Sequence, residues 1–287
     1  MTPPSTSGIP LEPEELALLH AALESGDAES RSRATAARAV LTDRLLERGD
    51  DIGRWLALSR SAGLAPSDLA ERDRLKRSAA RYLLGDVDRV LASQGRWYRD
   101  GFLAGAQLHV QHPAHLEGAR HHLMWRTLES LDLHWTSDRS EACAHFVGTN
   151  PTFAALTSVS VSHPDLLAVL VAYPDLPLRS LTLDVLPRRL ASSLARSTTF
   201  PELESVRLRR LPEHDILLER PLRRLLVELN LKGDQRLGLR TRMERSRAEH
   251  VELRYGQAAL RWDRRSDAWT ATQPRTWQHD RLELALG

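Results

Sequence analysis

A six-residue pattern, L-x-S-[LV]-x-[LV], recurs in this chain and constrains its fold more than any other feature. Successive copies begin 28, 22 and 25 residues apart. The four copies start at Leu128, Leu156, Leu178 and Leu203. Such recurrence is typical of stacked structural repeats, in which each short unit buries its apolar face against its neighbours.

Three weaker copies extend the series, beginning at Leu103, Leu222 and Ala248. The seven starts have a mean interval of about 24 residues, which is within the range of leucine-rich repeats. Alternation of apolar and polar residues within each copy predicts a short strand with its Leu and Val side chains directed inward. The Asn that usually follows the strand in such repeats is missing, so we expect irregular coils.

The segments between these strands change to a helical period. Short helices are predicted over residues 115–125, 141–147, 164–173 and 187–195, several of them opened by proline in the first turn. We therefore expect an α/β fold in which residues 96–255 form an irregular leucine-rich-repeat-like solenoid of short parallel strands plus helices.

The chain before the repeats has a helical pattern throughout. Helices are expected over residues 14–23 and 28–47, from Asp50 or Asp51 onward, and from a cap at Ser67 to about Leu84. Gly49 would end the second helix. Residues 14–95 are therefore predicted to be an all-helical N-terminal domain that covers the first coil, preceded by a disordered tail over residues 1–13.

The chain after the repeats predicts a C-terminal β cap over residues 256–287. Strands are expected at 258–263, 269–272 and 281–286, with turns at Gly256, at residues 266–267 and at Pro274. The tryptophans of this segment are interpreted as capping aromatic residues and not as a ligand cage: Trp262, Trp269 and Trp277.

Residues 41–56 read LTDRLLERGDDIGRWL. This stretch resembles the signature of the bacterial repeat-companion domain, a family expanded in myxobacteria, which reads roughly Y-A-D-W-L-E-E-R-G-D-P-R-G-E-F-I. The residues that match outright are Asp43, Leu45, Glu47, Arg48, Gly49, Asp50 and Gly53. Arg44 and Leu46 depart from the signature. The resemblance implies that leucine-rich-repeat-like sequence follows, and it implies no biochemical activity. The charged residues of the stretch are interpreted as helix-end pairing and a turn, not as a carboxylate site.

Composition and hydropathy indicate the cellular compartment of the protein. Cys143 is the only cysteine, which excludes an intramolecular disulfide and fits a reducing compartment. The longest apolar run, residues 166–173, is shorter than the roughly 20 residues of a membrane helix. Residues 1–13 lack the basic start and apolar core of a signal peptide. We expect a cytoplasmic protein with no membrane partner.

The basic residues are nearly all arginine, but the formal net charge of +2 is too small to indicate nucleic acid by itself. Over residues 201–287, 18 Lys and Arg residues stand against 14 Asp and Glu residues. Five arginines surround two predicted strands: Arg207, Arg209, Arg210, Arg223 and Arg224. They could bind a phosphate backbone, although the interleaved acidic residues favour a salt-bridged surface.

Histidine and serine are the residues that could carry chemistry. Six histidines lie close together in sequence: His109, His112, His115, His121, His122 and His134. They could form a zinc site, but no cysteine or consistent carboxylate joins them and the H-E-x-x-H motif is absent. The recurring serines occupy one structural position, whereas a catalytic serine needs its own base and acid. We predict no catalytic residue, no metal and no cofactor.

The leading hypothesis is therefore a non-enzymatic protein-protein interaction or adaptor module that binds another protein on the exposed sheet face. The candidate partner-binding residues are Asp132, Ser160, Thr182, Arg207, Arg209, Arg224 and Glu252. Two alternatives stay open: nucleic-acid binding through the Arg-rich C-terminal repeats, and a metal-dependent enzyme on the histidine cluster.

Overall fold

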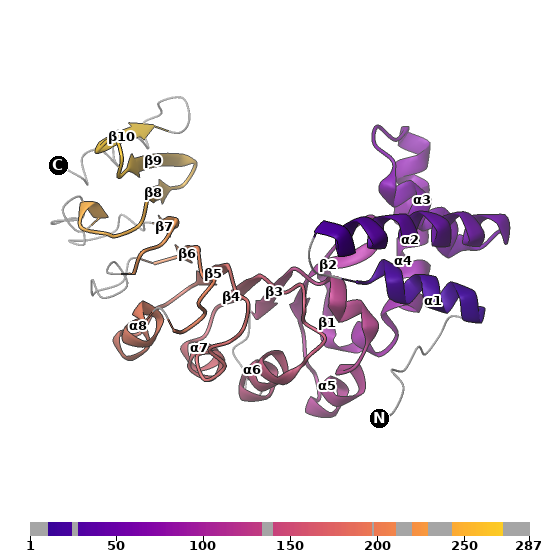
Figure 1. Cartoon of the computed structure of the whole chain (residues 1–287), viewed down its shortest axis with the longest axis horizontal. Helices are drawn as coiled ribbons and strands as arrows, with labels where there is room; N and C mark the ends of the chain where they lie inside the picture. Colours follow the sequence, from indigo (N-terminus) through magenta and orange to yellow (C-terminus); the bar gives the residue numbers. More distant parts are fainter. Residues whose placement is uncertain are drawn as a thin grey trace. The chain divides into compact units, whose positions relative to one another are not determined.

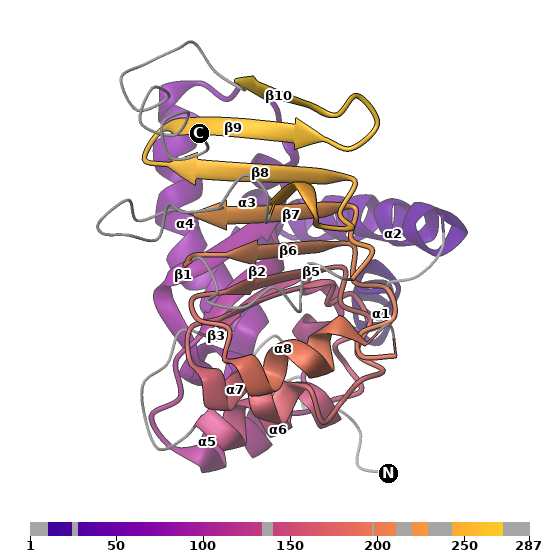
Figure 2. The ribbon, with the colours of Figure 1, turned by 90° about the vertical axis from the view of Figure 1, so that its left-hand side faces the viewer.

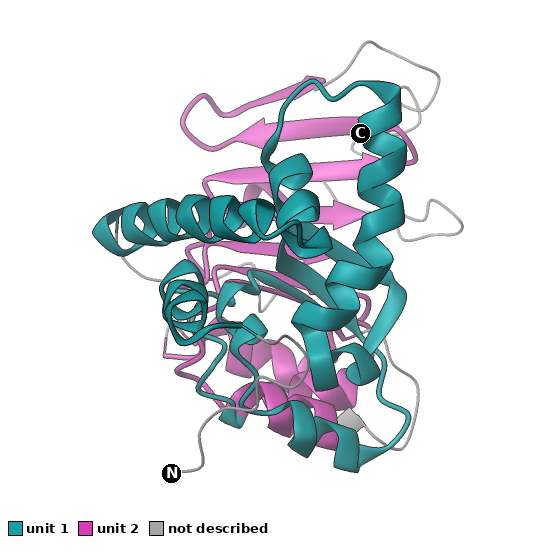
Figure 3. Cartoon of the chain, turned by 90° about the vertical axis from the view of Figure 1, so that its right-hand side faces the viewer, with its two compact units in different colours: residues 1–132, 149–156 teal, residues 133–148, 157–287 magenta. Residues whose placement is uncertain are grey.

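The computed structural model describes residues 11–24, 28–133, 140–196, 198–210, 220–228 and 243–271. They form a mixed α/β fold, as predicted, and the chain divides into two compact units (Figure 3). Unit 1 comprises residues 1–132 and 149–156, and unit 2 comprises residues 133–148 and 157–287. Within each unit the strands follow chain order in an open sheet (Figure 1). None of the described helices combines the length and apolar character that crossing a membrane requires.

Unit 1 begins with four helices, which confirm the helical prediction up to Leu84. They are α1 (Pro13–Ala22), α2 (Ala28–Glu47), α3 (Asp51–Arg60) and α4 (Pro66–Leu84). The expected cap of α4 is wrong by two residues, because Ala65 and not Ser67 is the N-cap. Pro66 occupies the first turn, where its missing N–H leaves no helical hydrogen bond unmade.

The turn between α2 and α3 accounts for several residues of the 41–56 stretch. Gly49 has a φ of 75°, a left-handed conformation that glycine adopts without strain. The carboxylate of Asp50 accepts the backbone N–H of Ile52 over 2.9 Å and so caps α3. A Cβ at Gly53 would lie 2.6 Å from the carbonyl carbon of Leu45, so α3 can approach α2 this closely only with glycine at that position.

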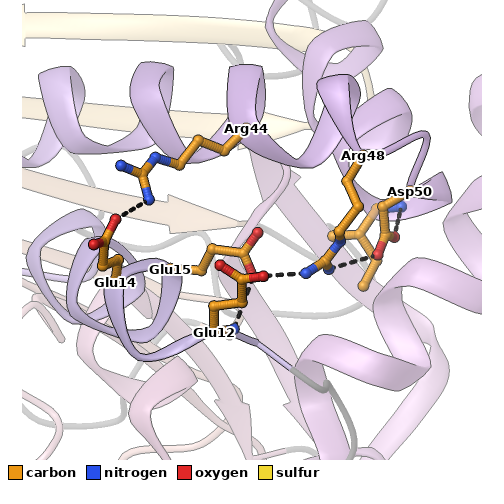
Figure 4. A network of polar contacts seen from close by, with 7 residues as sticks. Glu12, Glu14, Glu15, Arg44, Arg48 and Asp50 are labelled. Atoms are coloured by element: carbon orange, nitrogen blue, oxygen red, sulfur yellow. Dashed lines mark hydrogen bonds and ion pairs between the residues drawn. The ribbon is translucent and has the colours of Figure 1, made fainter.

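Arg48 joins this turn to α1 (Figure 4). Its Nη1 donates to Oε2 of Glu15 over 2.8 Å, and its Nη2 donates to Oδ2 of Asp50 over 3.0 Å. Glu15 is buried and also accepts the backbone N–H of Glu12, which forms a capping box at the start of α1. These contacts confirm helix-end pairing for Arg48 and Asp50.

A hairpin that the sequence analysis did not predict follows the helices. After the 3-10 helix η1 (Gly85–Val90), β1 (Leu91–Arg99) pairs antiparallel with β2 (Phe102–Leu108). The two turn residues, Asp100 and Gly101, have φ values of 53° and 82°. Positive φ at both positions is what a two-residue hairpin with right-handed twist requires. The expectation of an all-helical segment to residue 95 is therefore wrong.

Strand β1 is irregular. Its register against β2 shifts between Leu91 and Arg96, and again after Trp97. The guanidinium of Arg96 fills the first irregularity, because its Nε donates to the carbonyl of Ala92 over 3.0 Å and its Nη2 to that of Leu91 over 2.9 Å. Its Nη1 pairs with the carboxylate of Asp88. One side chain thus satisfies carbonyl groups of an irregular strand.

The rest of the described unit 1 sheet is β3 (Ser130–Leu133), which runs parallel to β2. The helix predicted over residues 115–125 consists of two shorter segments, α5 (Pro113–Ala119) and the 3-10 helix η2 (Leu123–Thr127). The indole of Trp125 is buried, and its Nε1 donates to the carbonyl of Ala119 over 2.6 Å. That bond joins the end of α5 to η2.

Unit 2 repeats a short strand and then a helix or loop. Its helices, which lie side by side in Figure 1, are α6 (Ser140–Thr149), α7 (Pro164–Leu170) and α8 (Arg188–Ala195). Its strands are β4 (Ser158–Val161), β5 (Ser180–Leu183), β6 (Ser205–Leu208), β7 (Arg224–Glu228), β8 (His250–Tyr255), β9 (Ala258–Asp263) and β10 (Ala268–Ala271). Strands β4 to β8 pair parallel, whereas β8, β9 and β10 pair antiparallel (Figure 2).

Strands β4 to β8 coincide with copies of the six-residue pattern, which confirms the predicted strand positions. The inward residues Val159, Leu181 and Val206 are fully buried. At the C-terminal side, β9 and β10 correspond to the strands predicted at 258–263 and 269–272. Trp262 is buried, and Nε1 of Trp269 donates to Oε1 of Glu244 over 3.1 Å. Trp277, Pro274 and the strand expected at 281–286 lie outside the described residues.

A buried arginine holds the segment that follows α8. Arg220 is 3% exposed. Its Nη1 donates to the carbonyls of Leu194 and Thr199 over 2.6 and 2.8 Å, and its Nη2 donates to that of Phe200 over 2.7 Å. Burial lowers the pKa of Arg220, but a guanidinium keeps its charge at neutral pH. The side chain therefore satisfies carbonyl groups at a helix end, where no helical partner is available.

Candidate functional site

One face of the unit 2 sheet carries two rows of side chains in register across the strands. The leading row consists of Ser158, Ser180, Ser205, Arg224, His250 and Asp263. The middle row consists of Ser160, Thr182, Arg207, Leu226, Glu252 and Arg261. Both rows alternate along their strands with the buried Val and Leu positions, so they occupy the same face of the sheet.

Six of the seven candidate residues lie in unit 2, at the positions that alternation along the strands predicts. Ser160, Thr182 and Arg207 are half-buried in the middle row, and Arg224 is exposed in the leading row. Arg209 follows the end of β6. The seventh candidate residue belongs to unit 1, where Asp132 lies on β3 opposite Gln107 of β2.

Glu252 differs from the others because it is only 5% exposed. Its Oε2 accepts a hydrogen bond from Arg224, and its Oε1 accepts one from Arg254. Burial alone would raise the pKa of Glu252, but the bonds from the two guanidinium groups outweigh burial and hold that pKa below its ordinary value. Glu252 thus faces outward as predicted, yet it orients two arginines instead of meeting the solvent.

Two more arginines of this face are paired with carboxylates. Nε of Arg207 donates to Oε1 of Glu228 over 3.0 Å, and Nη1 of Arg209 donates to Oδ1 of Asp184 over 2.9 Å. These contacts confirm the interpretation of the Arg-rich strands as a salt-bridged surface. Between Arg207 and Glu252, the middle row also contains Leu226, which is 6% exposed.

A pocket of about 400 Å³ lies over strands β6 to β9. It is lined by Glu204, Ser205, Arg223, Arg224, His250 and Arg261. Nη1 of Arg223 lies 3.8 Å from Oε2 of Glu204, whereas Arg261 is exposed and has no hydrogen bond or ion pair with any other side chain that the structure describes. Three guanidinium groups therefore stand against one carboxylate in the lining, while just outside it Glu252 pairs with Arg224 and Asp263 interacts electrostatically with Arg261.

His250 and Arg261 are not among the site residues predicted from the sequence. Alternation along β8 and β9 indicates the face of the sheet on which these two residues lie. Predicting that they belong to the site also requires the antiparallel register of the two strands, which places Arg261 opposite Glu252. Nδ1 of His250 lies 3.0 Å from Oδ2 of Asp263. Backbone N–H groups of Arg265 and Ser266 lower the pKa of Asp263, so this carboxylate stays ionised beside the imidazole.

Three histidines of the expected cluster, His112, His115 and His122, make local contacts. The rings of His112 and His115 contact edge to face, with centroids 5.4 Å apart. His122 is buried, and its Nδ1 accepts the backbone N–H of Met124 over 3.3 Å, which caps η2. Within the described ranges no group of three or more His, Cys, Asp or Glu side chains is arranged to hold a metal. His134 lies outside those ranges.

Comparison of the chain with protein-family models, with curated proteins and with solved structures finds no match. The geometry of the unit 2 face is therefore the basis for inferring a function.

Proposed function

We propose that this protein is a non-enzymatic interaction or adaptor module of the cytoplasm that binds another protein on the two-row face of unit 2. In this proposal the chain is an irregular leucine-rich-repeat-like solenoid with an N-terminal repeat-companion domain and a C-terminal β cap. The spacing of the six-residue pattern and the alternation of strand and helix in unit 2 support the solenoid. The resemblance of residues 41–56 supports the N-terminal assignment.

The observation that carries the proposal is the contrast between the two sides of the same strands. The buried positions are Leu or Val in one strand after another, because packing in the interior requires apolar side chains. The middle row changes from hydroxyl groups at Ser160 and Thr182 to charge at Arg207 and Glu252. A registered row of dissimilar polar side chains provides a specific pattern of charges and hydrogen-bonding groups, which gives selectivity for one partner more than affinity for all.

The pairing of the arginines favours a protein partner over nucleic acid. Arg207 and Arg209 each contact a carboxylate of their own, so a phosphate backbone would have to compete with charges already in place. Binding to nucleic acid depends on unneutralised cations along the phosphate track. A protein surface that offers both donors and acceptors fits the face better.

A pair of identical substitutions tests the proposal. The full chain would be used to capture its partner by cross-linking in the native host, and the purified partner would then be titrated against variants. Thr182→Glu places a charge in the middle row, and we expect it to weaken binding by about tenfold or more. Thr35→Glu, on the exposed side of α2, makes the same change elsewhere and should leave binding unaltered.

Equal affinities of the two variants and the wild type would show that the face is not the interface. Loss of capture on nuclease treatment would instead favour the nucleic-acid alternative.

A further inference from the structure

We propose that the pocket over β6 to β9 binds an acidic segment of the protein partner, with an Asp or Glu carboxylate seated among Arg223, Arg224 and Arg261. This inference rests on the proposed function, because it names the chemistry by which the partner is recognised. The lining residues all belong to unit 2, and four of its strands contribute to the site.

The carboxylates around the pocket do not neutralise all of its arginines, so positive charge remains that an anionic ligand can pair with. Glu252 is a single carboxylate shared by Arg224 and Arg254, so it cannot neutralise both guanidinium groups. At the rim, Glu204 lies 3.8 Å from Arg223, which is a loose ion pair between partly exposed side chains and contributes little. Arg261 adds a further cation, and the carboxylate that interacts with it electrostatically, Asp263, is shared with His250 and with two backbone N–H groups. An anion would therefore gain more from this site than a neutral ligand.

The site is also partly preorganised. The bond to buried Glu252 fixes the guanidinium of Arg224, and buried groups hold their partners more rigidly than exposed ones do. A ligand that binds an already oriented donor loses less conformational entropy. Arg261 and Arg223 remain able to adjust, and an arginine can grip a carboxylate with two parallel hydrogen bonds. Ser205 supplies a hydroxyl group beside them.

The size and surroundings of the pocket favour a discrete acidic group over a continuous phosphate chain. A volume of about 400 Å³ is sufficient for one acidic side chain and its flanking backbone. Beyond the pocket along β6, the next basic residues are Arg207 and Arg209, and both are paired with carboxylates. A polynucleotide would find no run of free cations there, whereas a peptide can place neutral groups over the paired residues.

A labelled acidic peptide tests the inference on the full-length chain. Fluorescence anisotropy would measure the affinity of fluorescein-labelled hexaglutamate for the wild type and for Arg261→Gln, Arg223→Gln and Arg264→Gln. We expect each of the first two variants to bind the peptide roughly tenfold more weakly, because each removes one of the cations. Arg264→Gln removes the same charge from the exposed turn after β9, outside the pocket, and should bind like the wild type.

Three results would overturn the inference. One is the absence of hexaglutamate binding, or an equal affinity for hexaglutamate in the wild type, Arg261→Gln and Arg223→Gln. Another is tighter binding of a labelled DNA duplex at physiological salt with the same dependence on these two arginines, which would make the pocket a phosphate-backbone site. The third is displacement of the peptide by an equal concentration of inorganic phosphate, which would assign the pocket to small phosphate anions. None of these results alters the outcome expected for Thr182→Glu, because that variant measures partner binding at β5. The proposal for the pocket and the proposal for the face can therefore fail separately.

Discussion

Titration of His122 should make unit 1 sensitive to mild acid. Its imidazole is buried against η2, and burial lowers its pKa to about 4, with a small opposing effect from Asp86. In the unfolded chain a histidine has a pKa near 6.5. Between these two values the unfolded chain binds a proton that the folded chain excludes, so the free energy of unfolding falls as the pH falls. Integrating that difference from about pH 7.5 to about pH 5 gives a loss of about 2 kcal/mol.

His122→Asn isolates this contribution. The side-chain oxygen of asparagine can accept the backbone N–H of Met124 as Nδ1 of His122 does, and it does not titrate. Urea unfolding, followed by tryptophan fluorescence, would give the free energy of unfolding of both proteins at the two pH values. The loss between them should be about 2 kcal/mol larger for the wild type than for the variant. The other histidines are common to both proteins, so their contributions cancel in the difference.

Equal losses in the two proteins would contradict the prediction, because they would mean that His122 takes up its proton in the folded state at its ordinary pKa. A variant that is already several kcal/mol less stable at the higher pH would indicate a lost cap, and the comparison between the two pH values would still report the titration.

Three further predictions concern stability and use the same urea assay. Arg220→Met should destabilise unit 2 by about 3 kcal/mol, since it leaves several buried carbonyl groups without a donor; an unchanged free energy of unfolding would show that water replaces the guanidinium. Gly53→Ala should cost about 1–3 kcal/mol because its Cβ would lie 2.6 Å from backbone. Gly118→Ala, in α5 with nothing within 4 Å, should instead gain about 0.5–1 kcal/mol, and a loss there would contradict the open space found around it.

The repeated strands of unit 2 could be predicted because their signal is local. Alternation within six residues places Val159, Leu181 and Val206 inward, and each is fully buried. The same alternation assigns Thr182 and Arg207 to the opposite face. What it cannot provide is the environment of each outward residue, because that depends on which side chains the neighbouring strands bring into register.

Glu252 illustrates that limit. Its position in the strand predicts an outward side chain, but its burial follows from Arg224 on one neighbouring strand and Arg254 two residues along its own strand. Strand β1 shows another limit. It contains Gly95 and Arg96 and little apolar alternation, so its extended form depends on pairing with β2 and on contacts made by one arginine. The Asp100-Gly101 turn was its only local signal.

The irregular form of β1 has a consequence for how the molecule behaves among copies of itself. A strand at the edge of a sheet offers unpaired backbone groups to any other chain, and a flat apolar edge favours aggregation. In β1 the carbonyls of Leu91 and Ala92 already accept bonds from Arg96, and the shifts in register bend the strand away from a straight template. A side chain folded back on its own strand therefore leaves fewer regular backbone acceptors on β1 for another chain to pair with.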